Sequence, residues 1–321
     1  MSWLVTGGAG YIGSHVVRAF VEANIDVVVV DNLSSGHRSF VPSQIPFVTA
    51  SITDAVALRE LFSVHDIDGV VHLAGYKYAG ESVTFPLETY KQNVTGTAVL
   101  LEAMANAGTG RMVFSSSAAV YGTPNVDLVT ETTETNPQSP YGESKLIGEW
   151  LIRDQAVATG LTHTSLRYFN VVGSGTDDIT DTSPHNLFPL IFRALAEGRT
   201  PAIFGNDYPT ADGTCVRDYV HVADVAEAHV AAATALMEGK HLEPVYNLGS
   251  GAGTSVGEIM NAVKTVTGIP FAPEIQPRRA GDPSRIVADG ALAARDVGWQ
   301  QRHTVESMVA TAWSAHQAHT K

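Results

Sequence analysis

The stretch LVTGGAGYIGSH, residues 4–15, joins an apolar run to a segment with helical periodicity. Within it, Gly8, Gly10 and Gly13 follow the spacing G-x-G-x-x-G, and Gly7 adds the related spacing G-x-x-G-x-x-G. Glycines at these places allow a tight turn, a close backbone approach to a pyrophosphate and close packing of the helix on its sheet. The start of the helix then offers free N–H groups and a positive dipole end to the phosphates. The stretch therefore predicts a turn that binds the phosphates of a dinucleotide.

A carboxylate stands where such a turn needs one for its cofactor. Asp31 ends the next apolar run, DVVVVD, at residues 26–31. An acid at this place accepts hydrogen bonds from both hydroxyls of a ribose and repels a 2′-phosphate. No arginine follows Asp31 directly. The sequence thus favours NAD over NADP.

The order of apolar and helical segments predicts the fold class. The apolar runs are continuous rather than alternating, as in strands that are buried on both faces of a parallel sheet. They lie at 3–7, 26–31, 46–50, 69–75, 111–117 and 163–170. Helical patterns lie between them, at 12–24, 54–64, 81–107 and 141–160. This alternation predicts an α/β protein with a doubly wound, Rossmann-like parallel sheet.

Proline and glycine interrupt the second half of the chain, which predicts a second, smaller, mixed α/β domain. A helical pattern and a strand-like run within 223–250 are expected to rejoin the first domain. We therefore expect an NAD-binding domain at 1–170, completed by 223–250. The substrate domain is expected to comprise 171–222 and 251–321.

Composition excludes several classes of partner. The formal net charge of the 321 residues is -13, whereas a nucleic-acid-binding protein needs a basic face. No apolar run approaches the length that spans a membrane, and MSWLVTGG reads as a strand rather than a leader. The single cysteine, Cys215, has no partner within the chain for a disulfide, which fits a reducing compartment. We expect a cytoplasmic protein with no nucleic acid and no membrane as partner.

A second motif, SPYGESKLIGEW at residues 139–150, places Tyr141 and Lys145 on one face of a predicted helix. The run RMVFSSS ends upstream, at the edge where an open α/β sheet binds ligands. A phenol ionises at about pH 10, and a nearby ammonium and nicotinamide cation favour the phenolate. We expect Tyr141 to exchange a proton with a sugar hydroxyl, with Ser117 as hydrogen-bond partner. Ser115 and Ser116 remain alternatives to Ser117.

The motifs TGGAGYIGSH, DNLS, SSSAAVYG and SPYGESKL resemble those of the extended short-chain dehydrogenase/reductases. Further motifs are similar to those of the UDP-glucose 4-epimerases, also called UDP-galactose 4-epimerases, over nearly the whole chain. They are LRYFNVVG, NLFPLI, AIFGNDYPTADGTCVRDYVHVADVAEAH, YNLGSG and RRAGD. The resemblance implies an isomerase that reversibly inverts C4 of UDP-glucose and UDP-galactose through a transient 4-keto sugar and bound NADH. It also implies a homodimer that packs through helices of the first domain.

The resemblance further implies roles for individual residues. Those in the catalytic positions are Ser117, Tyr141 and Lys145. Those expected to bind NAD are Gly7, Gly10, Tyr11, Ile12, Gly13, Asp31, Asn32, Ser51, Ile52, Leu73, Ala74, Gly75, Lys77, Tyr141, Lys145 and Tyr168. Those expected to bind the UDP-hexose are Ser117, Tyr141, Asn170, Asn186, Leu187, Ala202, Ile203, Phe204, Arg217, Arg279 and Asp282. The two arginines are expected to clamp the diphosphate, because a guanidinium engages two oxygens at once.

Three positions depart from the pattern or leave it open. Ser51 stands where the family usually has an aspartate that contacts adenine, and Gln92 stands where it usually has asparagine. Ile286 takes a position on the wall of the sugar pocket, and an isoleucine there leaves the acceptance of N-acetylated UDP-sugars open.

Two other functions remain as alternatives. One is another NAD-dependent nucleotide-sugar enzyme, such as a 4,6-dehydratase or a UDP-glucuronate epimerase or decarboxylase. Ala118 and Ala119 follow Ser117 where a dehydratase needs further acid or base residues, which argues against that class. The other is a non-enzymatic NAD-sensing module. No metal site is expected, because the 12 histidines follow no zinc motif.

Overall fold

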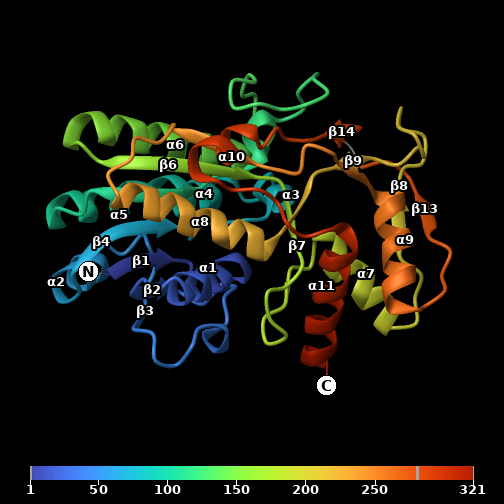
Figure 1. The fold of residues 1–321 in the computed structure, drawn as a ribbon, viewed down its shortest axis with the longest axis horizontal. Coiled ribbons are helices and arrows are strands. Elements are labelled where there is room, and N and C mark those ends of the chain that lie inside the picture. The colour runs from blue at the N-terminus through green and yellow to red at the C-terminus, as the bar shows by residue number, and fades with distance from the viewer. Residues whose placement is uncertain (1, 280–281, 321) are drawn as a thin grey trace.

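The computed structural model describes residues 2–279 and 282–320, and at its centre lies a seven-stranded sheet (Figure 1). The strand order is β11-β6-β5-β4-β1-β2-β3, and every pairing between neighbours is parallel. The strands are β1 (Ser2–Thr6), β2 (Val27–Asp31), β3 (Phe47–Thr49), β4 (Ile67–His72), β5 (Arg111–Ser115), β6 (Thr162–Tyr168) and β11 (Val245–Leu248). The predicted doubly wound sheet is confirmed.

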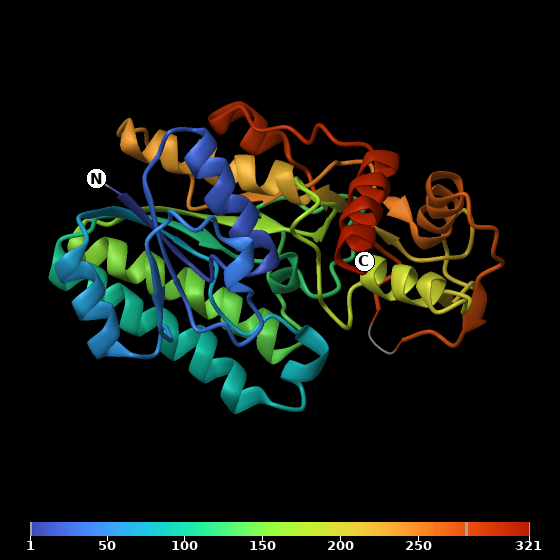
Figure 2. The ribbon, with the colours of Figure 1, turned by 90° about the horizontal axis from the view of Figure 1, so that it is seen from below.

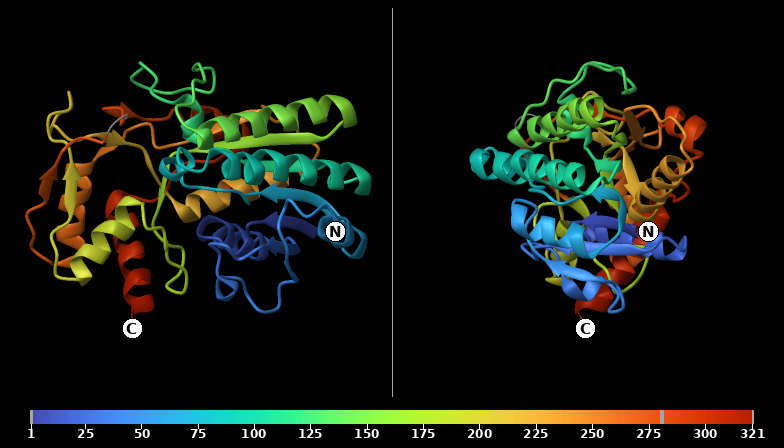
Figure 3. Two further views of the ribbon diagram at one scale, coloured as in Figure 1. Left: turned by 180° about the vertical axis from the view of Figure 1, so that it is seen from behind. Right: turned by 90° about the vertical axis from the view of Figure 1, so that its left-hand side faces the viewer.

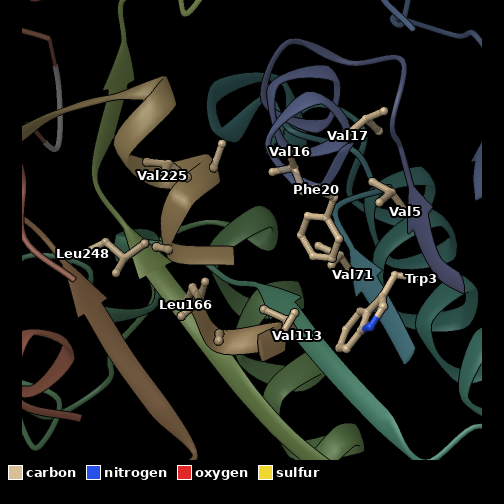
Figure 4. Packing of buried hydrophobic residues seen from close by; sticks show 14 of the residues in the cluster. Trp3, Val5, Val16, Val17, Phe20, Val71, Val113, Leu166, Val225 and Leu248 are labelled. Carbon is tan, nitrogen blue, oxygen red and sulfur yellow. The ribbon is translucent and has the colours of Figure 1, made fainter. Parts of the chain in front are cut away.

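Helices cover both faces of this sheet, as the end-on view in Figure 3 shows. One face carries α1 (Tyr11–Glu22), α8 (Val222–Met237) and α10 (Ala291–Val297). The other carries α2 (Ala55–Val64), α5 (Gly96–Ala107) and α6 (Pro140–Thr159). Because both faces are covered, successive residues of one strand enter different cores: Trp3 and Val5 pack with Phe20 (Figure 4), whereas Leu4 packs with Leu58. This explains the continuous apolar runs in the sequence.

The prediction of one continuous helix at 81–107 is wrong. The chain forms α3 (Ala79–Ser82), α4 (Pro86–Tyr90), a π-helical turn at Lys91–Thr95 and then α5. Pro86 occupies the first turn of α4, because proline has no N–H to give to a preceding helical turn. Asn93 in the π turn accepts a hydrogen bond from the Tyr76 backbone at 2.6 Å, so the break joins the helix to the loop after β4.

The second half of the chain builds a smaller lobe beside the sheet, on the right in Figure 2. Its helices are α7 (Leu187–Ala196), α9 (Val256–Thr267) and α11 (Val305–Thr320), which share one apolar core. Three small sheets complete it: β10 (Tyr219–His221) with β7 (Asn170–Val172); β9 (Val216–Arg217) between β12 (Thr254–Ser255) and β14 (Arg285–Ile286); and β13 (Glu274–Gln276) with β8 (Ala202–Phe204).

The segment from α8 to β11 returns to the large sheet. Strand β11 pairs with β6, with Val245 opposite Ser165 and Leu248 opposite Tyr168. Helix α8 packs against α1 and against β5 and β6. Strands β1 and β4 are neighbours although β2 and β3 lie on the other side of β1, so the strand order reverses at this point. Open α/β sheets bind ligands at the carboxyl ends of the strands beside such a reversal.

No helix formed by residues 2–279 and 282–320 combines the length and the apolar character needed to cross a membrane.

Candidate active site

A cavity of about 880 Å³ lies at the carboxyl edge of the sheet and extends to the smaller lobe. Its volume is in the upper part of the range of ligand pockets. One part of its wall comes from the glycine turn and the ends of β2 and β4, and the other from α7, β8 and β9. Ser117, Tyr141 and Lys145 also line it. The cavity therefore has room for more than one small ligand.

The glycine turn uses the G-x-x-G-x-x-G spacing of Gly7, Gly10 and Gly13. Gly7 has a φ of +70°, and a Cβ there would lie 2.8 Å from the Ala74 nitrogen. A Cβ on Gly13 would lie 2.1 Å from the Gly7 carbonyl oxygen. Gly8 instead faces the Val29 side chain in the core and does not line the cavity. No side chain caps the N-terminus of α1 at Gly10, so its first N–H groups are free to bind an anion.

Asp31 and Lys77 give this part of the cavity its charges. Asp31 accepts hydrogen bonds from the backbone nitrogens of Ala9 at 3.0 Å and Leu33 at 2.8 Å. Its carboxylate has lone pairs left for two ribose hydroxyls. Burial lowers the pKa of Lys77, while Asp181 and Asp31 act in the opposite direction. The glycine cradle, the carboxylate and the lysine together fit NAD.

The catalytic candidates meet at the start of α6. Ser117 precedes the 3₁₀ turn Ala118–Tyr121 and accepts a hydrogen bond from the Ala119 nitrogen at 3.2 Å. Lys145 donates from Nζ to the Ser115 carbonyl oxygen at 2.9 Å, and its Nζ lies 5.9 Å from the centre of the Tyr141 ring. The helix thus presents the phenol and the ammonium on one face, as the spacing predicts.

The protein groups alone do not lower the Tyr141 pKa, and the predicted lowering also depends on the nicotinamide cation. Burial raises the pKa of Tyr141, and a hydrogen bond with Ser117 lowers it by a smaller amount. Burial also lowers the pKa of Lys145 to about 8, although Glu149 acts in the opposite direction. Burial is therefore the larger cause of both pKa shifts.

The structure distinguishes the three consecutive serines that the sequence left as rivals. Ser115 contacts His229, with Oγ 2.7 Å from Nε2. Ser116 donates to Glu149 Oε1 at 2.5 Å. Ser117 alone of the three lines the cavity. Ser117 is therefore the serine in place to meet a substrate.

The smaller lobe supplies the other end of the cavity. Arg217 donates from Nη1 to the Pro283 carbonyl oxygen at 2.7 Å, and its Nη2 lies 3.5 Å from Asp282 Oδ1. Arg279 lies over the Phe204 ring, with its guanidinium carbon 4.0 Å from the ring centre. Two guanidinium groups beside an aromatic ring and a carboxylate suit a ligand with a diphosphate, a base and a ribose.

Most of the predicted site residues line this one cavity. The predicted cofactor residues that do so are Gly7, Gly10, Tyr11, Ile12, Gly13, Asp31, Asn32, Ile52, Leu73, Ala74, Gly75, Lys77, Tyr141, Lys145 and Tyr168. The predicted substrate residues that do so are Ser117, Tyr141, Asn170, Asn186, Leu187, Ala202, Ile203, Phe204, Arg217, Arg279 and Asp282.

Two residues are not brought to the cavity wall. The Ser51 hydroxyl contacts Thr53 at 2.8 Å, and Ser51 is absent from the lining. Ile286 is buried among apolar side chains that include Val120 and Leu146, so it does not form the cavity surface. Gln92 does line the cavity and donates to Glu88 at 2.7 Å.

The structure also adds polar residues that the sequence did not single out. Asp181, His185, Arg199 and Glu274 line the cavity. They come from irregular segments or segment ends, where neither periodicity nor a motif marks a function. Across residues 2–279 and 282–320, no group of three or more histidine, cysteine, aspartate or glutamate side chains could hold a metal ion.

Comparison with known proteins adds independent information. Residues 3–249 match the model of the NAD dependent epimerase/dehydratase family. The UDP-glucose 4-epimerase of Streptomyces lividans is 44% identical, over 99% of this chain and 97% of its own. That of Lactobacillus helveticus is 43% identical, over 100% of this chain and 98% of its own.

A solved structure agrees with these relatives. The UDP-glucose 4-epimerase from Stenotrophomonas maltophila, with bound NAD and formylated UDP-arabinopyranose, superposes with a TM-score of 0.94. It is 40% identical, and the match covers 100% of this chain and 99% of that one. The chain belongs to the NAD dependent epimerase/dehydratase family and, within it, to the UDP-glucose 4-epimerases.

Proposed function

We propose that this protein catalyses the reversible C4 epimerisation of UDP-glucose and UDP-galactose with tightly held NAD. The observation that carries the proposal is the position of Tyr141, Lys145 and Ser117. They lie on the wall of a single cavity whose one end has the glycine turn and Asp31, and whose other end has Arg217 and Arg279. A sugar joined to a diphosphate can thus reach the phenol while its nucleotide stays anchored.

NAD, when bound, supplies the hydride acceptor that converts C4 of the sugar to a ketone and afterwards the hydride donor that reduces it. The glycine turn and the N-terminus of α1 would hold its pyrophosphate, and Asp31 the hydroxyls of its adenosine ribose. Lys77 and Lys145 would add hydrogen bonds from the opposite wall. Because the intermediate ketone depends on return of the hydride, the chain has to retain the cofactor through each turnover.

Tyr141 would take the proton of the 4-hydroxyl and return it to the opposite configuration. Ser117 would hydrogen-bond the same hydroxyl. Since burial raises the pKa of Tyr141, the phenolate needs positive charge nearby, which Lys145 and the nicotinamide cation provide. The protein thus keeps Tyr141 protonated until the ligands that need it are in place.

Anchoring of the nucleotide would let the sugar turn while the rest of the substrate stays bound. Arg217 and Arg279 would clamp the diphosphate, Asp282 the uridine ribose and Phe204 the uracil. These contacts would supply local positive charge in a chain whose formal net charge is -13.

The experiment is direct. Purified protein supplied with UDP-galactose should yield UDP-glucose, detected by chromatography, without net formation of NADH. Absence of UDP-glucose after prolonged incubation would reject the proposal. Formation of a 4-keto-6-deoxy sugar would identify a dehydratase, and binding of NAD with no turnover of any UDP-sugar would identify an NAD-sensing module. A panel that includes N-acetylated UDP-hexoses tests the breadth of the sugar pocket.

We also propose a homodimer that packs through α4 and α6. These helices contact each other, and large apolar side chains on or beside them are exposed: Phe85, Leu87, Trp150 and Val157. Such exposure over neighbouring helices is typical of a protein–protein interface. Leu87→Asp should convert a dimer to a monomer in sedimentation velocity, whereas Val56→Asp on α2 should leave the sedimentation coefficient unchanged.

The chain would divide into one unit that binds NAD and one that binds the substrate. Residues 1–170 with 223–250 would form the NAD-binding unit, and 171–222 with 251–321 the substrate unit. Helix α10 is an exception, because Ala293 and Trp299 pack in the core of the large sheet. The single cysteine favours a reducing compartment such as the cytoplasm.

A further inference from the structure

An exposed hydrogen bond joins the two lobes beside the active-site cavity. His185 Nε2 lies 2.7 Å from Glu81 Oε1, and the two side chains are 50% and 39% exposed. Glu81 lies on α3, which follows β4 of the large sheet, and His185 lies just before α7 of the smaller lobe. This bond therefore connects the part of the chain expected to bind NAD with the part expected to bind the substrate.

A second donor holds the Glu81 carboxylate in place. The Tyr76 hydroxyl donates to Oε2 at 2.6 Å. The hydrogen bonds from Tyr76 and, next, from His185 lower the pKa of Glu81, so the carboxylate is ionised at neutral pH and can only accept hydrogen bonds. His185 Nε2 must then carry a proton and donate it. The bond forms whether or not the imidazole is charged.

Both ends of the bond belong to segments that form the cavity wall. The loop at 76–78 lines the cavity, and so do His185 and its neighbour Asn186. Lys77 in this loop is a proposed contact of the cofactor, and Asn186 is a proposed contact of the substrate. The hydrogen bond thus joins the wall beside the cofactor to the wall beside the nucleotide.

The segment that carries His185 is folded as a unit. Asp181 accepts hydrogen bonds from the Ser183 nitrogen at 3.0 Å and from Asn186 Nδ2 at 2.7 Å. Ser183 Oγ accepts from the His185 nitrogen at 3.2 Å. The Tyr78 ring meets the imidazole edge-on, with ring centres 5.2 Å apart. A movement of His185 away from Glu81 therefore carries Asn186 with it and opens the cavity wall.

Buried contacts fix the chain a few residues before this segment. The Tyr11 hydroxyl donates to the Gly173 carbonyl oxygen at 2.5 Å, and the Gly175 nitrogen donates to His15 Nε2 at 2.9 Å. Tyr11 and His15 are buried. Water replaces an exposed hydrogen bond at little cost, whereas a broken buried one leaves polar groups without partners. The chain is therefore held firmly at Gly173 and Gly175 and is released most easily at His185.

We propose that Glu81 and His185 form a gate of the active site. Their hydrogen bond holds residues 181–186 closed over a bound nucleotide sugar, and its rupture opens the cavity for entry and release. Ser82, beside Glu81, accepts from the Tyr141 nitrogen at 3.1 Å, so the gate is attached to the helix that carries the catalytic phenol. The role in turnover rests on the proposed function, whereas the closure of the segment does not.

The first test needs neither ligand nor turnover. In Glu81→Ala, the backbone amides within 181–187 should exchange hydrogen roughly twofold to fivefold faster than in the wild-type protein, the scale of one exposed interaction. Mass spectrometry of peptides measures the exchange. The control is Glu238→Ala, which breaks the exposed pair with Lys240 after α8 and should leave this exchange unchanged. Unchanged exchange in Glu81→Ala overturns the proposal.

The second test follows the release of a ligand. His185→Phe keeps an aromatic ring beside Tyr78 but removes the Nε2 donor, so ³H-labelled UDP should leave roughly twofold to fivefold faster during a chase with unlabelled UDP. The matched control is Arg18→Met, which breaks an exposed ion pair with Asp178. Neither partner of that pair lines the cavity, and this variant should release UDP at the wild-type rate.

The two gate residues should also act as one. In the His185→Phe background, Glu81→Ala should not accelerate UDP release further. Multiplied effects would mean that the residues act independently and would contradict the gate. Equal acceleration by Arg18→Met would contradict it too, because the loss of any exposed pair near this segment would then suffice.

The third test uses the fate of the ketone during turnover. A 4-keto sugar that escapes takes away the carbon to which hydride returns, so the cofactor stays reduced. With UDP-galactose, His185→Phe should therefore accumulate bound NADH, detected by absorbance, faster than the wild-type protein. Faster UDP release without this rise would exclude a role in retaining the ketone. If the wild-type protein makes no UDP-glucose, the proposed function fails, and hydrogen exchange still decides whether Glu81 holds the segment closed.

Discussion

Arg167 on β6 and Glu149 on α6 form a bidentate buried ion pair, with Nε 2.8 Å from Oε1 and Nη2 2.6 Å from Oε2. Glu149 lies one helical turn after Lys145. Their side chains are only 6% and 7% exposed. Ser116 donates to the same carboxylate, and Arg167 also donates to the Tyr121 hydroxyl at 2.8 Å. The pair joins β6 to α6, the helix that carries Tyr141 and Lys145. The pair stabilises the fold only while both partners are present, because a buried charge without its partner lowers the free energy of unfolding.

Removal of the arginine from this pair should therefore strongly destabilise the fold. We expect Arg167→Met to lower the free energy of unfolding by roughly 3–5 kcal/mol, because Glu149 would keep a buried negative charge. Urea denaturation measures the change. The control is Arg153→Met, which breaks the exposed pair with Asp154 and should cost no more than about 0.5 kcal/mol. Equal effects of the two substitutions would contradict this account.

The glycine turn gives a steric prediction. Gly13→Ala should abolish NAD retention, because its Cβ would lie 2.1 Å from the Gly7 carbonyl oxygen and would force the turn open. The nucleotide released by denaturing the purified protein can be measured by absorbance. Gly110→Ala places its Cβ in open space and should leave the NAD content at the wild-type level. Full NAD content in Gly13→Ala would mean that the turn does not hold the cofactor.

The lowered pKa of Lys145 predicts a dependence of stability on pH. Because burial lowers this pKa from 10.5 to about 8, the unfolded chain binds more protons between those pH values. The contribution of this group to stability therefore rises as pH increases through that window. Lys145→Met should make cofactor-free protein more stable at pH 7 by roughly 1–3 kcal/mol.

The same substitution should abolish turnover, and its stabilising effect should shrink towards pH 10. Urea denaturation at the two pH values measures the difference. Lys91→Met, at an exposed position, is the matched control and should change stability little at either pH. A Lys145→Met protein that is less stable at pH 7 would show that the hydrogen bond to Ser115 outweighs the desolvation of the ammonium.

The proposed role of Tyr141 is to transfer the proton of the 4-hydroxyl. Tyr141→Phe should reduce kcat by about 10²–10⁴-fold, the usual contribution of a general acid or base, while the protein still retains NAD. Progress curves with UDP-galactose give the rate. Tyr246→Phe removes a hydroxyl that contacts Asp296 at 3.1 Å on β11, and it should retain kcat. Near-normal turnover in Tyr141→Phe would assign the base to another group.

The sequence was informative where local chemistry determines structure. Strand β2 was evident because both faces of the sheet are covered, so all five of its residues are buried and four of them are valines. The turn at Gly7 was predictable from the local spacing of its glycines. At the start of α9, Ser255 accepts from the Glu258 nitrogen and the Glu258 side chain accepts from the Ser255 nitrogen, so this helix start is also encoded locally.

Other features depended on distant parts of the chain. The roles of Ser115 and Ser116 are decided by His229 and Glu149, which follow them by many residues and show no pattern that connects them. The pKa of Tyr141 depends on how much protein covers it, which spacing does not reveal. Asp181 reaches the cavity from an irregular segment, where no periodicity predicts its position.

The return of α8 and β11 to the sheet has a consequence for synthesis on the ribosome. When β6 emerges, the face of β5 and β6 that α8 will cover still exposes Val113 and Leu166, and the edge of β6 has no neighbour. The nascent chain has to wait for residues beyond 248 before that surface is sealed. Chaperones that recognise extended apolar segments should therefore engage this polypeptide late in its elongation, and a stop codon placed between β6 and α8 should yield an aggregating fragment rather than a free cofactor-binding unit.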